Sequence, residues 1–441
     1  MIKKVKGTQD FIGLDCRKWQ ALEDVIRQIT TVYGYSELRT PIFEYTEVFK
    51  RENDSSDMVN KEMYTFSMGD YSLTLRPEGT AGIVRSFVEE KMYGNPAELP
   101  AKLYYMGPMF RHEAPQKGRY RQFSQFGVEC IGVKSPLLDA ENIALGYSLV
   151  SALGISNIKI HINTLGDDES RAAYRSALKE YFAPHVADLC EDCKRRYEQN
   201  PLRLLDCKVD GHKDVMKNAP KMSDYLNAES AAYFEEVKKC LDALEIPYVV
   251  DDGLVRGLDY YIHTVFEAIA TNDALGSQMA VFAGGRYDGL VEYFGGPSMS
   301  GVGFAAGMER LIMMAESEGN QLAENPTLDA YVMPLSVACQ TKALELTTVL
   351  RANGYMADMD VQGRSMKAQF KSVDRSGATF ALILGEDEIA NGEVRVKHIP
   401  SQEQKNVKFD ELIDYIDSFY EITDITCTCG NENCTCGKGN N

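Results

Sequence analysis

The chain has 441 residues, of which 44% are hydrophobic and 25% charged, and its formal net charge is −18 at neutral pH. These proportions exclude a disordered or fibrous chain, and the length predicts more than one domain. No apolar run reaches the roughly 20 residues of a membrane-spanning helix, and the polar N-terminus lacks a secretory signal, so we expect a cytoplasmic protein without membrane contact. A uniformly acidic surface would repel nucleic acid, so the charge alone favours a small-molecule enzyme.

The first two thirds of the chain predict helices mixed with long strands. Residues 17–32 repeat apolar side chains at helical spacing, whereas residues 157–163 alternate isoleucine with polar residues, as a half-buried strand does. Residues 260–270 and 280–285 are rich in β-branched and aromatic side chains and also predict strands. Because regular βαβ spacing is missing, we expect an α+β fold with an antiparallel sheet flanked by helices.

The character of the sequence changes at two places. From about 169 to 245 it becomes charged and helix-favouring, which predicts a helical insertion within a first domain of residues 1–325. A polar linker near 315–327 precedes a regular alternation of strands and helices, which predicts an α/β domain over 328–421. Residues 422–441 lack a hydrophobic period, so we expect a flexible, cysteine-rich tail.

The densest group of functional residue types lies between residues 109 and 132. The segment predicts a hairpin whose loop carries four cations, Arg111, Lys117, Arg119 and Arg121, against one acid, Glu113. Guanidinium groups match phosphate oxygens in bidentate fashion, so such a loop suits a polyphosphate. The alternative is a solvated hairpin tip.

The second half of this hairpin weighs against a merely solvated tip. Gln125 and Glu129 are four residues apart on a predicted strand and therefore share a face among apolar neighbours. A carboxylate placed there needs a cationic or hydrogen-bonding partner.

Four further segments carry weaker signals. Glu78 and Thr80 stand near a predicted helix start, which indicates either an anion site or an ordinary helix cap. Arg256 precedes the tyrosine pair at 260–261, and residues 283–296 contain a glycine pair. Residues 301–314 form a glycine-rich strand that leads into a helix with Glu309 and Arg310 in its first turn, and such glycines usually mark close approach of a ligand or backbone.

Taken together, these segments resemble the histidyl-tRNA synthetase family of class II aminoacyl-tRNA synthetases. The matching motifs occur in order as KGTQDF, RTPIFE with Pro41, LRPEGTAG, FRHEAPQKGRYRQFSQFGVE, LVRGLDYY, AGGRYDGL and GMERL. The stretch that begins GRSMKAQFKSVDRSG resembles the family's anticodon-binding domain, and the likeness covers residues 1 to about 420.

The resemblance implies a fold and a reaction. The fold would be a class II antiparallel-sheet catalytic domain with the helical insertion, then a C-terminal α/β anticodon-binding domain, in a homodimer with RTPIFE at its interface. The enzyme would join L-histidine to ATP, giving histidyl-adenylate and pyrophosphate. It would then pass the histidyl group to the terminal adenosine of tRNA(His). ATP would bring Mg²⁺ with it.

The resemblance also implies a role for each site residue. Catalytic cations would be Arg111 and Arg256 at the α-phosphate and Arg310 at the terminal phosphates. ATP would be bound by Arg111, Glu113 at the adenine, Arg119 and Arg310. Histidine would be bound at its amino group by Glu78, Thr80 and Gln125. Its imidazole would be bound by Glu129 and Tyr261, with Tyr260 and Tyr287 shaping the pocket. Arg111 and Arg256 would also bind histidine.

Two positions depart from the family's commonest pattern, Ala114 and Ser124, where many members carry larger polar side chains. Ala114 lies in the loop that resembles the acceptor-stem contact. The departures bear on how the tRNA end is recognised and not on the chemistry.

Seven of the eleven cysteines cluster in two groups. Cys190, Cys193, Cys207 and His212 have a spacing compatible with structural zinc, although thiols that simply pack a helical insertion would also explain them. The tail group of Cys427, Cys429, Cys434 and Cys436 could chelate a soft metal. No metal ligand is assigned from the sequence.

Two other functions are weighed against a synthetase. A regulatory subunit of ATP phosphoribosyltransferase would resemble the catalytic domain, but it typically lacks the anticodon domain and several of the ATP and histidine contacts, which this chain has. A metal-sensing or metal-storage protein would explain the cysteines and not the phosphate-suited motifs.

Local charge also qualifies the argument from net acidity. Residues 110–125 and 361–375 each hold four cations and one acid, and residues 194–213 hold six cations and three acids, so each window is net +3. Phosphate contacts need only local positive charge. We therefore expect tRNA to follow one basic track on an otherwise acidic surface.

Overall fold

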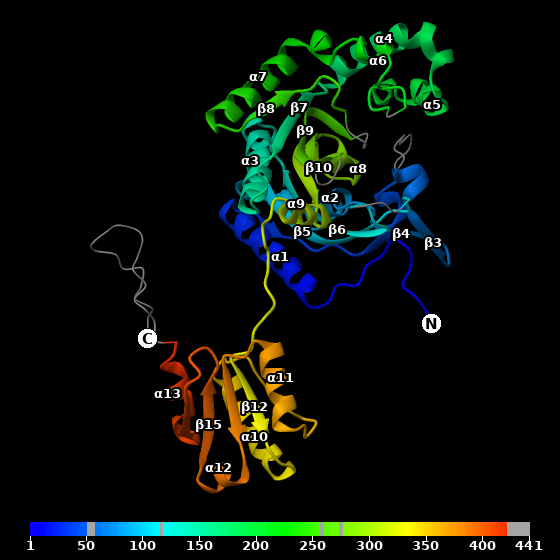
Figure 1. The fold of residues 1–441 in the computed structure, drawn as a ribbon. Coiled ribbons are helices and arrows are strands. Elements are labelled where there is room, and N and C mark those ends of the chain that lie inside the picture. The colour runs from blue at the N-terminus through cyan, green and yellow to red at the C-terminus, as the bar shows by residue number, and fades with distance from the viewer. Residues whose placement is uncertain (51–57, 115–117, 208, 256–259, 273–276, 421–441) are drawn as a thin grey trace, which may run out of the picture. The chain divides into compact units, whose positions relative to one another are not determined.

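The computed structural model describes residues 1–50, 58–114, 118–207, 209–255, 260–272 and 277–420 (Figure 1). The chain divides into two compact units, Met1–Glu324 and Asn325–Asn441. Among the described residues, the helices are too short or too polar to cross a membrane.

The first unit is built on an eight-stranded sheet in the order β1-β5-β6-β11-β10-β9-β7-β8. Its strands are β1 (Ser36–Glu37), β5 (Ala101–Phe110), β6 (Gln122–Ile131), β7 (Ile158–Thr164), β8 (Tyr248–Val250), β9 (Tyr261–Asn272), β10 (Ser277–Tyr287) and β11 (Gly301–Gly307). The central pairs are antiparallel, as predicted, whereas the edge pairs β1–β5 and β7–β8 are parallel. Parallel neighbours need long crossovers, and the chain supplies one in each case.

One face of this sheet carries the largest hydrophobic core among the described residues. The helices on it are α1 (Leu14–Val32), α3 (Pro136–Ala152), α7 (Ala228–Ala243) and α9 (Met308–Ser317). Helix α1 confirms the helix predicted over 17–32. On β6, alternate residues Phe126, Val128 and Cys130 point into this core, so Gln125 and Glu129 belong to the opposite face.

The opposite face carries a second core and the residues of chemical interest. Helices α2 (Thr80–Glu89) and α8 (Leu290–Tyr293) and apolar residues of the inserted segment pack there. Short helical turns connect the elements of the first unit: η1 (Thr46–Val48), η2 (Met58–Glu62), η3 (Met92–Gly94) and η4 (Pro96–Glu98).

The segment between β7 and β8 is helical, as the sequence predicts. Its elements before α7 are α4 (Asp168–Phe182), η5 (Ala183–Asp188), α5 (Glu191–Gln199), η6 (Pro201–Leu204), α6 (Asp214–Lys217) and η7 (Met222–Tyr225). Helix α7 differs from these, because its Phe234, Val237 and Leu241 join the sheet core and not the second core. Its amphipathic face therefore makes α7 part of the layered domain.

A three-stranded sheet, in the order β2-β4-β3, stands beside the main sheet. Its strands are β2 (Phe43–Tyr45), β3 (Tyr64–Met68) and β4 (Tyr71–Leu75). One face holds Thr74, which is fully buried. The residues of the other face that are large, apolar and exposed are Phe43, Tyr45, Phe66, Met68 and Tyr71.

The second unit is a five-stranded sheet in the order β13-β12-β14-β15-β16 with helices on both faces, which confirms the predicted α/β alternation. The parallel strands β12 (Ala330–Pro334), β13 (Ala357–Met359) and β14 (Phe380–Leu384) precede the antiparallel β15 (Glu393–His398) and β16 (Gln404–Lys408). Its helical elements are η9 (Val337–Cys339), α10 (Gln340–Ala352), α11 (Met366–Ser376), α12 (Glu386–Ala390), η10 (Phe409–Glu411) and α13 (Leu412–Asp417).

Candidate active site

A cavity of about 320 Å³ opens against the strands β6, β10 and β11. Antiparallel pairing of β5 with β6, in which Gly107 faces Gln125, brings the two halves of the 109–132 hairpin together and confirms the predicted hairpin. Most of the charged and amide side chains on the cavity come from this hairpin and from α9, namely Arg111, Glu113, Arg119, Gln125, Glu309 and Arg310, and β9 adds Glu267.

Arg111 follows the end of β5 and is held in place on two sides. Its Nε donates a hydrogen bond of 2.8 Å to the carbonyl of Pro77, and its guanidinium lies 5.2 Å from the ring centroid of Phe123. Within the described part of the chain, its two terminal nitrogens have no hydrogen-bond partner. The side chain is therefore fixed and still presents four N–H groups.

Arg310 approaches the same cavity from the first turn of α9. Its Nη1 donates to the carbonyl of Ala280 at 2.9 Å, and its Nε to that of Gly118 at 3.4 Å. Burial lowers the pKa of Arg310, and the positive charges of Arg119 and Arg111 lower it further. Glu113 pairs with this group through Arg119 at 3.1 Å. Three guanidinium groups that repel one another without a ligand are suited to a polyanion.

Glu309, beside Arg310, is turned toward β6. Its carboxylate accepts two hydrogen bonds from the backbone N–H of Ser124, at 2.8 and 3.1 Å, and burial raises its pKa to about 7. The Ser124 backbone makes this contact, so the unusual side chain at that position does not disturb it. Glu267 and Glu309 both line the cavity and offer the carboxylate oxygens that Mg²⁺ prefers.

A buried carboxylate lies four residues further along β6. Glu129 is 1% exposed; Thr80 Oγ1 donates to its Oε1 at 2.6 Å and Tyr287 Oη to its Oε2 at 2.8 Å. Burial raises the pKa of Glu129 to about 8 despite these two donors. Each carboxylate oxygen keeps a second lone pair for a further donor.

Glycines on β11 make room for Glu129 and its partners Thr80 and Tyr287, a group that we call the Glu129 corner. A Cβ on Gly303 would lie 2.1 Å from Glu129 Oε2, and one on Gly301 would lie 2.3 Å from the ring of Tyr287. The glycine-rich strand therefore accommodates the neighbouring site side chains, as well as forming one side of the cavity.

Glu78 has a structural role at the start of α2. Its two carboxylate oxygens accept hydrogen bonds from the backbone N–H groups of Thr80, at 2.6 Å, and Ala81, at 3.0 Å. The helix cap, the simpler of the two interpretations, is therefore the one observed, and this cap also positions Thr80 against Glu129.

Aromatic rings enclose the Glu129 corner. The ring centroid of Tyr260 lies 4.7 Å from that of Tyr261 and 5.8 Å from that of Tyr287. The sequence analysis did not single out Tyr105, whose ring lies over Gly79 and Gly127, so closely that a Cβ on either would overlap it at 2.2–2.3 Å. Alternation along β5 toward the Glu129 face is the signal that could have found it.

Two of the buried polar atoms that lack a hydrogen-bond partner within the described ranges lie at this site. They are the hydroxyl oxygen of Tyr105 and Oε1 of Gln125. Buried polar groups are nearly always paired in folded proteins. The Tyr105 hydroxyl, in the Glu129 corner, and the Gln125 oxygen, on the cavity wall, are therefore available to a bound ligand.

The structure brings most of the predicted site residues together. Arg111, Glu113, Arg119, Gln125 and Arg310 share the cavity, and Glu78, Thr80, Glu129, Tyr260, Tyr261 and Tyr287 gather in the adjoining buried region. Arg256 lies outside the described residues, as do the tail cysteines 427, 429, 434 and 436.

The first cysteine cluster differs in one member from the set that the sequence spacing suggested. Cys190, Cys193 and Cys207 come together, but with Asp210 and not with His212, which is exposed. The Asp210 side chain points toward the thiols, with its backbone N–H donating to Cys207 Sγ, and spacing along the sequence could not reveal this.

Comparison with known proteins gives a consistent result. Residues 7–311 match the family model described as histidyl-tRNA synthetase, and residues 329–419 match that of the anticodon binding domain. A histidine–tRNA ligase of Lysinibacillus sphaericus is 50% identical over 94% of this chain and 98% of its own length. One from Geobacillus kaustophilus is 49% identical over 93% and 97%.

Solved structures agree in fold. The apo histidyl-tRNA synthetase of S. aureus is 42% identical and superposes with a TM-score of 0.81 over 94% of this chain and all of that one. A protein of Bacillus halodurans described as an ATP phosphoribosyltransferase regulatory subunit/histidyl-tRNA synthetase is 20% identical with a TM-score of 0.62, over 87% of this chain and 98% of that one, so it shares the fold alone.

Proposed function

The chain belongs to the histidyl-tRNA synthetase family and is a histidine–tRNA ligase, and within that activity we propose a division of labour between the arginine cavity and the Glu129 corner. The enzyme activates L-histidine with ATP to histidyl-adenylate and pyrophosphate. It then transfers histidine to the 3′-terminal adenosine of tRNA(His).

ATP would occupy the cavity that the three arginines share. Arg111, rigidly held with free N–H groups, would bind the α-phosphate, while Arg119 and Arg310 would bind the terminal phosphates and Glu113 the adenine amino group. Mg²⁺ would accompany ATP and supply further positive charge, with Glu267 and Glu309 as oxygen donors. The observation that carries this proposal is the gathering of Arg111, Arg119 and Arg310 on one cavity.

Histidine would lie between the arginine cavity and the Glu129 corner. Gln125, with its unpaired Oε1, and Thr80 and Glu78 would receive the α-amino group. Glu129 would accept an imidazole N–H with its remaining lone pairs, facing Tyr261, while Tyr260 and Tyr287 enclose the ring. A ring that both donates and accepts hydrogen bonds needs such a mixed pair.

The chemistry requires positioning more than a side-chain nucleophile. An oxygen of the histidine carboxylate attacks the α-phosphorus, and the bond to the bridging oxygen of the β-phosphate breaks to release pyrophosphate. Arg111, and by resemblance Arg256, would stabilise the charge that builds on the α-phosphate oxygens. The terminal ribose hydroxyl of the tRNA then attacks the histidyl carbonyl, and AMP leaves.

We also propose the domain roles that the resemblance implied. Residues 1–325 would bind histidine, ATP and the tRNA end, residues 328–421 would bind the anticodon, and residues 422–441 would be peripheral. The match of residues 329–419 to the anticodon binding domain supports the second of these roles. A part in protein synthesis implies a cytoplasmic location.

The exposed sheet face supports the proposal of a homodimer. Phe43, Tyr45, Phe66, Met68 and Tyr71 are between 40% and 61% exposed on one face of the β2-β4-β3 sheet, next to the RTPIFE segment. A contiguous apolar face of this kind usually marks an interface. We propose that a second copy of the chain covers it.

Histidine-dependent ATP–pyrophosphate exchange tests the proposed function, together with charging of tRNA(His). Both reactions should occur, and exchange should fall by orders of magnitude in Arg256→Ala with the fold intact. An effect of less than about threefold would contradict the role proposed for Arg256. Exchange without charging would instead favour a paralogue that only binds histidine.

A further inference from the structure

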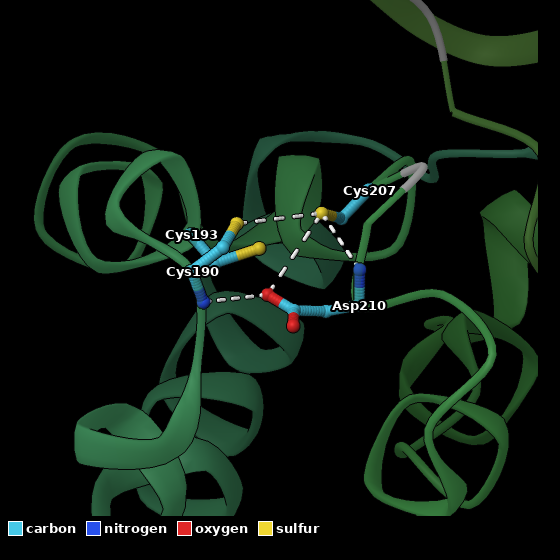
Figure 2. A group of neighbouring side chains, drawn as sticks. All are labelled: Cys190, Cys193, Cys207 and Asp210. Carbon is cyan, nitrogen blue, oxygen red and sulfur yellow. Dashed lines mark hydrogen bonds between the residues drawn. The ribbon is translucent and has the colours of Figure 1, made fainter.

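Three thiols and a carboxylate converge in the inserted helical segment, away from the arginine cavity (Figure 2). Cys190 caps the N-terminus of α5, Cys193 lies in its first turn, and Cys207 and Asp210 belong to the turn after η6. The ligand atoms of the four side chains all lie within 4.8 Å of one another.

The distances within the cluster are those of a tetrahedral metal site. The Sγ atoms of Cys190 and Cys207 are 3.7 Å apart, and Cys207 Sγ lies 3.9 Å from Asp210 Oδ2. A tetrahedron with zinc–sulfur bonds of about 2.3 Å and zinc–oxygen bonds of about 2.0 Å has edges of about 3.8 and 3.5 Å. The set therefore needs only a small contraction to bind zinc. A disulfide, at about 2.0 Å between sulfurs, would need a much larger one.

The surroundings suit a charged ligand set. Cys193 and Asp210 are fully or almost fully buried and Cys207 is 7% exposed. The backbone N–H of Asp210 donates to Cys207 Sγ at 3.3 Å, a contact that favours a thiolate. Lys213 Nζ binds Asp210 Oδ1 at 2.7 Å, so the second oxygen, Oδ2, is the one turned toward the sulfurs.

A buried aspartate among three thiols lacks an explanation as simple packing. Thiols alone behave as small hydrophobic side chains, but a buried carboxylate is costly unless cations or hydrogen bonds compensate it. Lys213 and the N–H of Cys190, at 2.8 Å from Oδ2, compensate part of this cost. A divalent cation between Oδ2 and the three sulfurs would compensate the remainder.

We propose that Cys190, Cys193, Cys207 and Asp210 bind one structural Zn²⁺ that joins the start of α5 to the segment that carries Cys207 and Asp210. On binding, the three thiols lose their protons to solvent, and the metal gains three sulfur ligands and one oxygen ligand. Thiolates select Zn²⁺ over hard cations. Four protein ligands leave no open position, so the ion has a structural and not a catalytic role.

The test uses the full-length chain with Cys427, Cys429, Cys434 and Cys436 all replaced by serine, so that the tail contributes no metal. It is purified without chelator or affinity tag, and zinc is measured by elemental mass spectrometry. We expect close to one zinc per chain. Cys193→Ser and Cys207→Ser should each lower the zinc content at least about tenfold.

Matched controls separate this ligand set from its neighbours. Cys240→Ser, a half-buried cysteine outside the cluster, and His212→Ala should both retain full zinc content. Asp210→Asn should weaken zinc binding by roughly 10- to 100-fold in competition with a chelator. Loss of zinc in His212→Ala with retention in Asp210→Asn would overturn the assignment of Asp210.

Replacement of zinc by Co²⁺ tests the proposal in the chain with the intact cluster, so the result does not depend on whether the variants fold. In the chain with the intact cluster, Co²⁺ should give the intense visible bands of tetrahedral coordination and a sulfur-to-metal charge-transfer band in the near ultraviolet. A chain that purifies without zinc and shows neither band would overturn the proposal. So would a Cys190–Cys207 disulfide, detected by alkylation and mass spectrometry of protein prepared under reducing conditions.

Discussion

The Glu129 corner and the arginine cavity both border strand β6, yet their charged groups are compensated to different degrees. Glu129 is buried and raised in pKa to about 8, and both of its oxygens already accept hydrogen bonds from the protein. Arg111, Arg119 and Arg310 share one cavity, where the charges of Arg111 and Arg119 oppose that of Arg310 and Glu113 pairs with Arg119.

The difference corresponds to the two parts of the reaction. Recognition of an imidazole by shape and hydrogen bonds needs a dry, pre-formed pocket, in which an unpaired polar group is costly and wrong ligands are rejected. Stabilisation of a polyphosphate needs surplus positive charge, which the ligand itself neutralises. The following changes should affect one region and spare the other.

The largest effect should come from Arg111→Ala. It removes the fixed guanidinium whose free N–H groups face the cavity, and we expect the exchange rate to fall by about 10³-fold or more. Steady-state exchange kinetics provide the measurement, with circular dichroism as a check of folding. Arg111→Lys keeps the positive charge without the planar guanidinium and should lose less activity. Equal losses in the two variants would show that positive charge alone does not support exchange at this position.

Glu129→Gln should act on histidine alone. The amide turns an N–H group toward Thr80 or Tyr287, both of which donate to the carboxylate in the wild type. We expect the KM for histidine to rise by roughly 100-fold and the KM for ATP to change less than about threefold. A comparable rise in both KM values would mean that the two regions are not separate.

The pH dependence of stability should reveal the same carboxylate. The pKa of Glu129 is raised to about 8 in the folded chain from 4.5. The folded state therefore holds a proton that the unfolded state has released between these values, so this contribution to stability is complete below pH 4.5 and is lost as the pH rises through 8. We expect the difference in unfolding free energy between Glu129→Gln and wild type to change by up to about 5 kcal/mol across this window, because each pKa unit corresponds to about 1.4 kcal/mol. Denaturant titrations at several pH values measure it, and parallel profiles would refute the raised pKa.

The smallest effect should be that of salt. Arg119 is partly exposed, so mobile ions screen the arginine cavity, whereas Glu129 is shielded from them. Raising ionic strength should increase the KM for ATP about threefold and leave the KM for histidine nearly constant. An equal dependence of both constants would show that the corner is open to solvent.

The sequence predicts these regions with uneven success. The hairpin, the helix start at Thr80 and the shared face of Gln125 and Glu129 follow from alternation and local motifs, and the structure has all three. Tyr105 is missed because its importance depends on two glycines, Gly79 and Gly127, that are distant from each other along the chain and meet its ring only in the fold.

Local charge counts also have a limit. The window 194–213 has a surplus of cations, but Lys194 pairs with Glu191 at 2.8 Å and Arg195 with Asp192 at 3.0 Å, and both acids lie just before the window. Arg364 likewise pairs with Asp360, just before the window 361–375. Pairing with acids three or four residues earlier neutralises charges that a count within the window leaves unopposed. A single basic track for tRNA therefore stays a prediction, with its strongest support at the arginine cavity.

The sequence by itself determined the family, the reaction and the two kinds of secondary-structure pattern, because spaced motifs and residue periodicity are properties of the chain. Tertiary structure alone decided which groups share an environment. It paired Glu129 with Thr80 and Tyr287, set three arginines against one cavity, and put Asp210 in place of His212 beside three thiols. Burial, pKa and metal geometry depend on distances across the fold, and spacing along the chain does not specify those distances.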